Sequence, residues 1–172
     1  MVTLDSALRV QPVLREALQE LQDRFAYYPG SRQARTVLQL GDGRSESPGE
    51  SVTRVQFFRY GIPMPEPQYH VINSRGQLVG VSDFGWEEYR HLAEFDGKVK
   101  YQKLLRPVRA RRTACSGRSV ARTRCVPKAT PMSRFVWNMI MPDSARRSMA
   151  ELRRAMDQSR RLNARGRTVI AS

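Results

Sequence analysis

Three β-strands are predicted in residues 68–97, QYHVINSRGQLVGVSDFGWEEYRHLAEFDG. Apolar and polar residues alternate over 68–72, 78–84 and 91–96, which is the two-residue period of a strand. Residues 73–76, NSRG, supply turn chemistry between the first two strands. The stretch therefore predicts a small antiparallel sheet in which each strand pairs with the next along the chain.

A helix is predicted directly before this sheet. Residues 47–50, SPGE, provide a capping serine, a proline suited to the first helical turn and a glutamate that completes a capping box. Gly61 is suited to the C-terminal end of the helix. The residues expected on its apolar face are Val52, Val55 and Phe58. Alternating prolines over 63–67 then force an extended connector to the first strand.

Further helices are predicted toward both ends of the chain. Apolar residues follow a helical stripe over 12–25, and Ser31 is suited to cap a shorter helix. An alternating strand is expected from Phe135, Trp137, Met139 and Met141. A helix capped by Asp143 or Ser144 is expected to run to about Ala164. The predicted fold class is α/β (α+β), with N-terminal helices, a small, mostly antiparallel sheet of three to four strands, and a C-terminal helix.

The net charge of +14 is unevenly distributed. Residues 1–96 carry 10 basic and 13 acidic side chains, residues 97–142 carry 12 basic and none acidic, and residues 143–172 carry 8 basic and 3 acidic. Clustered cations favour polyanions, with nucleic acid first and anionic lipid second. The residues expected to contact nucleic acid are Lys103, Arg106, Arg109, Arg111 and Arg112. The alternative is a solvated basic tail that binds phosphate weakly and without sequence preference.

Composition divides the chain into four segments. Residues 1–44 are predicted as an N-terminal helical segment and residues 45–106 as an αβββ core. Residues 107–131 contain no aromatic side chain, no carboxylate and no periodicity, which predicts a disordered basic linker. Residues 132–172 are predicted as a strand followed by a basic helix. No apolar run reaches the roughly 18 residues of a spanning helix, and residues 1–5 lack a secretory signal. A cytoplasmic protein without a membrane partner is therefore expected.

Acidic side chains are placed close together on the predicted strands. Asp83 ends the second strand, and Glu94 and Asp96 lie two residues apart on the third, so that their side chains share one face. Lys98 and Lys100 follow with the same period. Converging carboxylates bind a hard cation such as Mg²⁺, which activates phosphodiesters, and a lysine stabilises the developing charge. The alternative is a solvated face with mutual salt bridges.

A set of short motifs runs through this region. They are SESPGES at 45–51 with Arg54, GIPMP at 61–65 with Gln68, DFGW at 83–86, and EFDG at 94–97. Together they resemble the very-short-patch-repair-like branch of the restriction-endonuclease-like PD-(D/E)xK nucleases, which includes domain of unknown function 559. The similarity is greater still to actinobacterial abortive-infection antitoxin-like proteins, the regulators of type IV toxin–antitoxin systems.

The resemblance implies roles for individual acids. Asp83 and Glu94 take the positions of the metal-binding acids. Asp96 stands where the lysine of the superfamily's ExK motif is expected. Glu46 and Glu50, on the preceding helix, are placed to add a carboxylate to the same site.

Three departures from the family pattern bear on whether the chain is a competent nuclease. Lys100 and Tyr101 stand where nuclease-like relatives often carry histidines. Antitoxin-like relatives usually have a winged-helix domain before this region, and only 44 residues precede Ser45, which indicates truncation. Residues 107–131 do not resemble the charged helix of the relatives. One hypothesis is that this segment is encoded out of frame; the alternative is a genuine linker.

These observations predict an antitoxin-like or DNA-associated protein that uses a PD-(D/E)xK-like scaffold without full catalytic competence. Fold alone does not dictate activity, so this prediction depends on analogy. DNA and a cognate toxin are the expected partners, and no small-molecule cofactor is evident. Two alternatives stay open. One is a metal-dependent DNA endonuclease that uses Mg²⁺, and the other is a decayed gene product with no activity.

Overall fold

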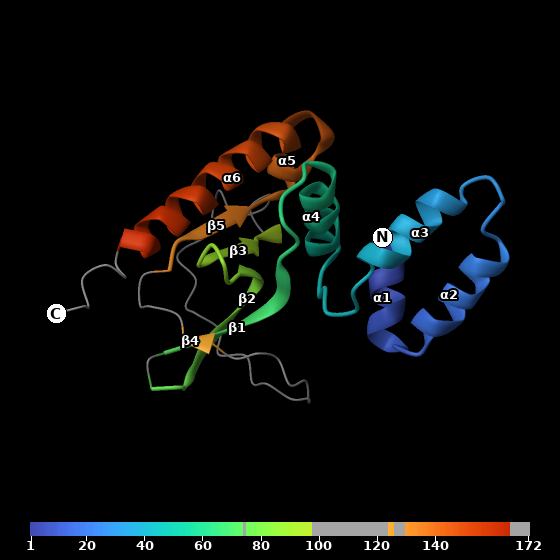
Figure 1. Cartoon of the computed structure of the whole chain (residues 1–172), viewed down its shortest axis with the longest axis horizontal. Helices are drawn as coiled ribbons and strands as arrows, with labels where there is room; N and C mark the ends of the chain where they lie inside the picture. The colour runs from blue at the N-terminus through green and yellow to red at the C-terminus, as the bar shows by residue number, and fades with distance from the viewer. Residues whose placement is uncertain (74, 98–123, 126–129, 166–172) are drawn as a thin grey trace, which may run out of the picture.

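The predicted sheet and its flanking helices are present in a computed structural model, which describes residues 1–73, 75–97, 124–125 and 130–165. The helices are α1 (Val2–Val10), α2 (Leu14–Arg24), α3 (Ser31–Leu40), α4 (Pro48–Arg59), α5 (Trp137–Ile140) and α6 (Pro142–Arg165). The strands are β1 (Glu66–Ile72), β2 (Leu78–Trp86), β3 (His91–Phe95), β4 (Arg124–Cys125) and β5 (Met132–Phe135). Figure 1 shows α1, α2 and α3 grouped to one side of the sheet.

The sheet has the strand order β4-β1-β2-β3-β5. β1 pairs with β2 and β2 with β3, both antiparallel, which confirms the predicted three-stranded meander. β5 joins the other side of β3 in parallel, and the two-residue β4 runs parallel to the end of β1. The fold is therefore α/β with a mixed sheet, as the sequence predicted for its class.

α4 begins with the predicted capping box. The amide of Glu50 donates to Ser47 Oγ at 3.2 Å, and that hydroxyl donates to Glu50 Oε1 at 2.7 Å. The prediction for its apolar face is wrong at Phe58, which is 50% exposed; Val52 does pack against the core, and Thr53 and Phe57 are fully buried. The reason is that α4 is covered on two sides, by the sheet and by the N-terminal helices, so that no single apolar stripe defines its buried surface.

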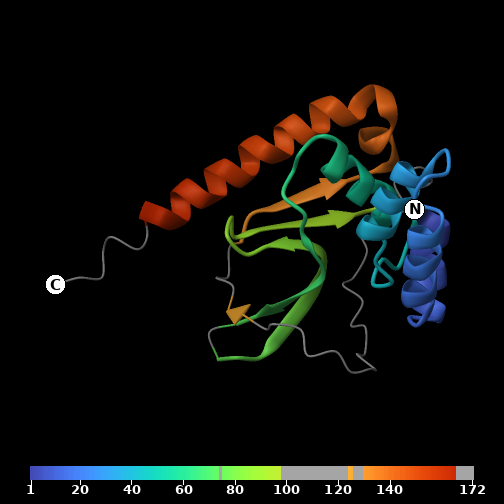
Figure 2. The same cartoon turned by 45° about the vertical axis from the view of Figure 1, so that its right-hand side comes forward.

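The core lies between the sheet and the pair α4 and α6, which cover the same face (Figure 2). The ring of Phe57 meets those of Phe84, Trp86 and Phe135 edge-on, with centroids 5.2, 5.3 and 5.8 Å away. The α6 residues that complete this core are Met149, Leu152 and Met156, each at most 2% exposed. Burying these large apolar side chains is the main favourable contribution to stability.

Two local predictions are corrected by the structure. The strand expected over 135–141 ends at Phe135, and Trp137–Ile140 forms the short helix α5. Alternate positions over so few residues are also compatible with a helical turn, and Ile140 is buried there. Ser31 does not cap α3; the cap residue is Gly30, with a φ of 87°, and Ser31 Oγ donates to the carbonyl of Ala26.

Several sequence predictions lie outside the described residues. They include the disordered linker over 107–131, apart from the backbone of residues 124–125 and 130–131, and the hypothesis that this segment is encoded out of frame. The predicted C-terminal helix is present as α6 and extends to Arg165, but it begins at Pro142, so Asp143 and Ser144 lie in its first turn and neither is the cap residue.

Candidate functional site

Asp83 and Glu94 lie opposite each other on neighbouring strands. β2 and β3 pair Phe84 with Ala93, so Asp83 and Glu94 are the next two residues in the same register. The Asp83 Oδ2 atom accepts a hydrogen bond from the Phe95 amide at 2.7 Å. Directly opposed residues of an antiparallel pair project from the same face of the sheet, so the predicted convergence is present for Asp83 and Glu94, one residue beyond the last paired positions, whereas Asp96 lies after the end of β3.

Glu50 approaches these strands from the N-terminus of α4. It is 6% exposed, and its Oε2 atom accepts from the Glu46 amide at 2.8 Å and from Gln68 Nε2 at 3.4 Å. Gln68 has a φ of 52°, a backbone conformation that non-glycine residues seldom adopt. The same carboxylate therefore closes the capping box of α4 and links this helix to β1.

Gly49 allows α4 to come this close to β3. A Cβ atom at position 49 would lie 1.9 Å from Cε1 of Phe95. The Phe95 ring also meets the Trp137 ring edge-on, with centroids 5.1 Å apart. The glycine of the SPGE motif therefore positions Glu50 beside the strand that carries Glu94.

Four carboxylates share one electrostatic environment. Burial raises the pKa of Asp83 to about 6; the hydrogen bond from the Phe95 amide opposes this, and the charges of Glu50, Glu94 and Glu46 add to it. The structure thus brings Glu50 of α4 near the acids of β2 and β3, together with Glu46, which lies two residues before α4 and not on the helix as predicted. Asp96 follows β3, where its amide donates to the carbonyl of Phe135 at 2.8 Å.

These acids do not form a metal site as they are placed. In the described part of the chain, no three His, Cys, Asp or Glu side chains are positioned to hold one ion. Both carboxylate oxygens of Glu50 accept hydrogen bonds within the cap, and Glu94 Oε2 lies 3.9 Å from Arg134 Nη2. Mg²⁺ requires oxygen ligands in near-ideal octahedral geometry. The sequence-predicted metal pair, Asp83 and Glu94, is therefore adjacent without being a fitted ligand set.

Seven basic residues predicted for the site or for nucleic-acid contact lie outside the described residues. They are Lys98, Lys100, Lys103, Arg106, Arg109, Arg111 and Arg112. Among the described residues, Arg134 on β5 is placed at these acids, opposite Glu94 in the parallel register. Sequence patterns gave no signal for Arg134, because its position depends on a pairing between strands some 40 residues apart in the chain.

His91 is a packed residue of β3. It is 2% exposed. Its Nδ1 lies 2.9 Å from Ser159 Oγ and its Nε2 lies 2.8 Å from Ser133 Oγ. Ser159 Oγ donates to the carbonyl of Ala155, so it accepts from His91 Nδ1. Burial lowers the pKa of His91, which favours the neutral imidazole, and the hydrogen bond to Ser159 places its proton on Nδ1.

Replacing Asp83 by asparagine is expected to change how stability depends on pH. The folded pKa of about 6 lies above the ordinary value of 3.8, so the stability that Asp83 provides at low pH is lost as pH rises through about 6. Asparagine keeps an acceptor for the Phe95 amide and removes the charge. Thermal unfolding should therefore show the variant more stable than its parent at pH 7.5, with the difference shrinking toward pH 4.

The matched control is Asp23→Asn, which removes one exposed carboxylate from α2. Its difference in melting temperature from the parent should stay nearly constant over the same pH range. Taking differences from the parent also cancels the opposite contribution of His91, which favours folding as pH rises toward 6.5. An Asp83→Asn curve parallel to the control would contradict the raised pKa of Asp83, which arises first from burial and then from the neighbouring carboxylates.

Comparison with known proteins finds partial relatives. Residues of this chain are 37% identical over 99 positions to an uncharacterized protein of Mycobacterium tuberculosis strain CDC 1551 / Oshkosh, and equally to one of strain ATCC 25618 / H37Rv. The aligned part is 56% of this chain and 35% of each relative, so the chain spans about a third of their length. No family model matches the chain, and no solved structure matches it.

No helix in the described part of the chain is both long enough and apolar enough to cross a bilayer.

Proposed function

We propose that this chain is an antitoxin-like, DNA-associated protein that uses a PD-(D/E)xK-like scaffold without full catalytic competence. The observation that carries the proposal is the engagement of the site's acids in internal contacts. Glu50 is bonded within the cap of α4, and Glu94 lies beside Arg134. The contacts of Glu50 link α4 to β1, and the pair of Glu94 with Arg134 links β3 to β5. This arrangement supports a scaffold better than a reaction centre.

The charge of the chain supports association with DNA. Residues 97–172 carry 20 of the 30 Lys and Arg side chains and 3 of the 16 acidic ones. Cations concentrated in this way neutralise phosphates and release the counterions condensed on a duplex. A regulator of this kind acts in the cytoplasm, where bacterial DNA lies, together with a cognate toxin as its protein partner.

Binding to a fluorescent 20-base-pair duplex of mixed sequence is expected to depend steeply on salt. Four or more phosphate contacts weaken affinity on the order of 100-fold between 50 and 200 mM NaCl. Fluorescence anisotropy over this range measures the effect, and EDTA should leave the binding unchanged. Affinity indifferent to salt, or no binding at 50 mM NaCl, would reject association with DNA.

A metal-dependent DNA endonuclease is the second candidate. It is favoured by the raised pKa of Asp83, because perturbed pKa values gather at functional sites. Its test is nicking of plasmid DNA in Mg²⁺ or Mn²⁺ by the parent chain, with Asp83→Ala and Glu94→Ala beside it. Cleavage lost in both variants supports the endonuclease, and cleavage unchanged in both indicates contamination or another site.

A decayed gene product predicts a chain that unfolds without cooperativity. Thermal unfolding of the purified chain tests this alternative. A sharp transition is the behaviour of an intact domain and counts against a decayed gene product.

A further inference from the structure

The outer surface of α6 carries arginines at a regular interval. They occur as pairs at 146–147, 153–154 and 160–161. A spacing of seven residues is close to two turns of helix, and successive pairs rotate only about 20° around the axis. The second members of the pairs, Arg147, Arg154 and Arg161, define what we call the outer row.

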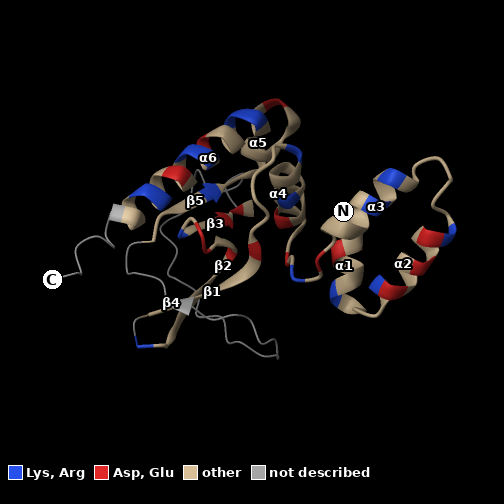
Figure 3. Ribbon diagram, viewed as in Figure 1, with Lys and Arg blue, Asp and Glu red and all other residues tan. Residues whose placement is uncertain are grey.

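The outer row points away from the core. The opposite side of α6 is buried through Met149, Leu152 and Met156, and at about 100° per residue the outer row lies on the far side from these three. All three arginines of the row are exposed. Figure 3 shows the basic residues along the length of this helix.

Two of the three first members of the pairs, Arg153 and Arg160, have contacts within the fold. Arg153 Nη2 donates to the carbonyls of Tyr60 and Gly61 at 3.0 and 2.6 Å. The guanidinium of Arg160 lies 5.9 Å from the centroid of the Tyr89 ring. In the outer row, Arg147 pairs with Glu151 at 3.0 Å and Arg154 donates to the carbonyl of Ala150 within α6. These outer contacts are exposed and local, so they compete weakly with a phosphate.

We propose that the outer row of α6 binds the phosphate backbone of duplex DNA, an inference that rests on the proposed association with DNA. At 1.5 Å per residue the row spans about 21 Å, which is about six base pairs along the duplex at 3.4 Å per step. A straight row of guanidinium groups matches a regular line of phosphates. Arginine contacts of this kind position a protein on DNA without reading its sequence.

Other polyanions fit this surface less well. Single-stranded nucleic acid is held by aromatic side chains on which its bases stack, and α6 contains no Phe, Tyr or Trp. A helix that lies on a membrane inserts an apolar face, and the apolar face of α6 is packed against the sheet. Duplex DNA requires only the exposed charges.

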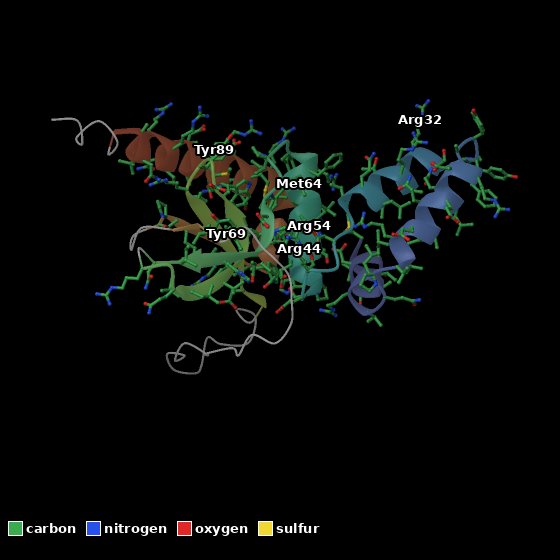
Figure 4. The ribbon with its side chains drawn as sticks, turned by 60° about the horizontal axis from the view of Figure 1, so that its bottom comes forward. Arg32, Arg44, Arg54, Met64, Tyr69 and Tyr89 are labelled. Carbon is green, nitrogen blue, oxygen red and sulfur yellow. The ribbon has the colours of Figure 1, made fainter. Side chains whose placement is uncertain are left out.

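The test compares two variants with the same loss of charge. One is Arg147→Gln with Arg154→Gln and Arg161→Gln. The other is Arg24→Gln with Arg32→Gln and Arg35→Gln, on α2 and α3, which lie at the far end of the molecule from α6; Figure 4 labels Arg32 there. Glutamine is a good helix former, so α6 is retained. Thermal unfolding checks that both variants fold.

Binding of the 20-base-pair duplex is then measured between 50 and 200 mM NaCl. The plot of log K against log salt should lose about 2 to 3 units of slope in the outer-row variant, at about 0.9 for each phosphate contact. The control variant should keep the slope of the parent. Equal slopes in the two variants would overturn the assignment to α6.

The outcomes separate this inference from the proposed function. Steep binding by the parent and by both variants leaves association with DNA in place and overturns the role of α6. Absence of duplex binding by the parent at 50 mM NaCl would reject both the association with DNA and the role of α6. Phosphatidylglycerol vesicles provide the remaining arm, because vesicle binding that needs the outer row, without duplex binding, would assign the surface to lipid and overturn the inference.

Discussion

Replacing Asp5 by alanine is expected to lower the free energy of unfolding by about 3–5 kcal/mol, the range for removing one partner of a buried ion pair. Asp5 Oδ2 lies 3.2 Å from Arg54 Nη1, and the two side chains are 1% and 5% exposed. Asp5 Oδ1 accepts from the Asp42 amide at 2.8 Å. The pair thus fastens α1 and the loop after α3 to α4, where Figure 4 labels Arg54.

The cost arises from the guanidinium that stays behind. Burial lowers the pKa of Arg54, and the charge of Asp5 acts in the opposite direction. Without Asp5 the cation remains buried beside Ser45 Oγ and the carbonyl of Leu40. Uncompensated buried charge is far less favourable than an apolar group of similar size.

Urea unfolding measures the loss of stability in Asp5→Ala and compares it with the loss from breaking an exposed ion pair. Arg147 and Glu151 are also one ion pair, with side chains 87% and 46% exposed, and Glu151→Ala should cost no more than about 1 kcal/mol. Adding Arg54→Met to Asp5→Ala should restore part of the loss, since the buried charge is then gone. A loss for Asp5→Ala no larger than for Glu151→Ala would show that the pair does not hold the N-terminal helices.

The elements of the sheet could be predicted because their signals are local. The two-residue period and the turn at 73–76 fix the order and antiparallel sense of β1, β2 and β3. The capping box of α4 is likewise a local signal, because four consecutive residues form it. These signals place Asp83 and Glu94 on neighbouring strands and Glu50 at the start of the helix before the sheet.

The parts that could not be predicted depend on contacts between distant segments. The parallel pairing of β5 with β3 places Arg134 beside Glu94, and no periodicity reports such a pairing. Gln68 reaches Glu50 through a backbone conformation that its sequence neighbours do not require. The sequence therefore located the acids but not their partners, and the partners are what distinguish a scaffold from a ligand set.

The burial of α4 on two sides could not be predicted for the same reason, because it depends on contacts with distant segments of the chain. Hydrophobic periodicity identifies one covered stripe, whereas Arg54 and Phe57 of α4 are both buried, against different neighbours. Arg54 faces the N-terminal helices and Phe57 faces the sheet. Arg54 is polar, so hydrophobic periodicity does not mark it as buried. Its role becomes visible only from its ion pair with Asp5.

Replacing Gly49 by alanine is expected to cost about 1–3 kcal/mol, the range for overpacking a filled core. The new Cβ would lie 1.9, 2.2 and 2.4 Å from three ring atoms of Phe95. The ring has little room to retreat, because Trp137 packs edge-on against it. Either α4 or β3 must shift, and a shift of β3 also strains the bond from the Phe95 amide to Asp83.

Gly80→Ala is the matched control for this prediction, because a Cβ there meets no atom within 4 Å and its backbone suits any residue. Denaturant unfolding should show Gly80→Ala near the parent in stability and Gly49→Ala well below it. Combining Gly49→Ala with Phe95→Leu should cost less than the sum of the two single changes, since the smaller side chain relieves the overlap. Additive losses would mean that the contact between position 49 and Phe95 does not set the distance from α4 to β3, and Glu50 would then owe its place beside Asp83 to the capping box alone.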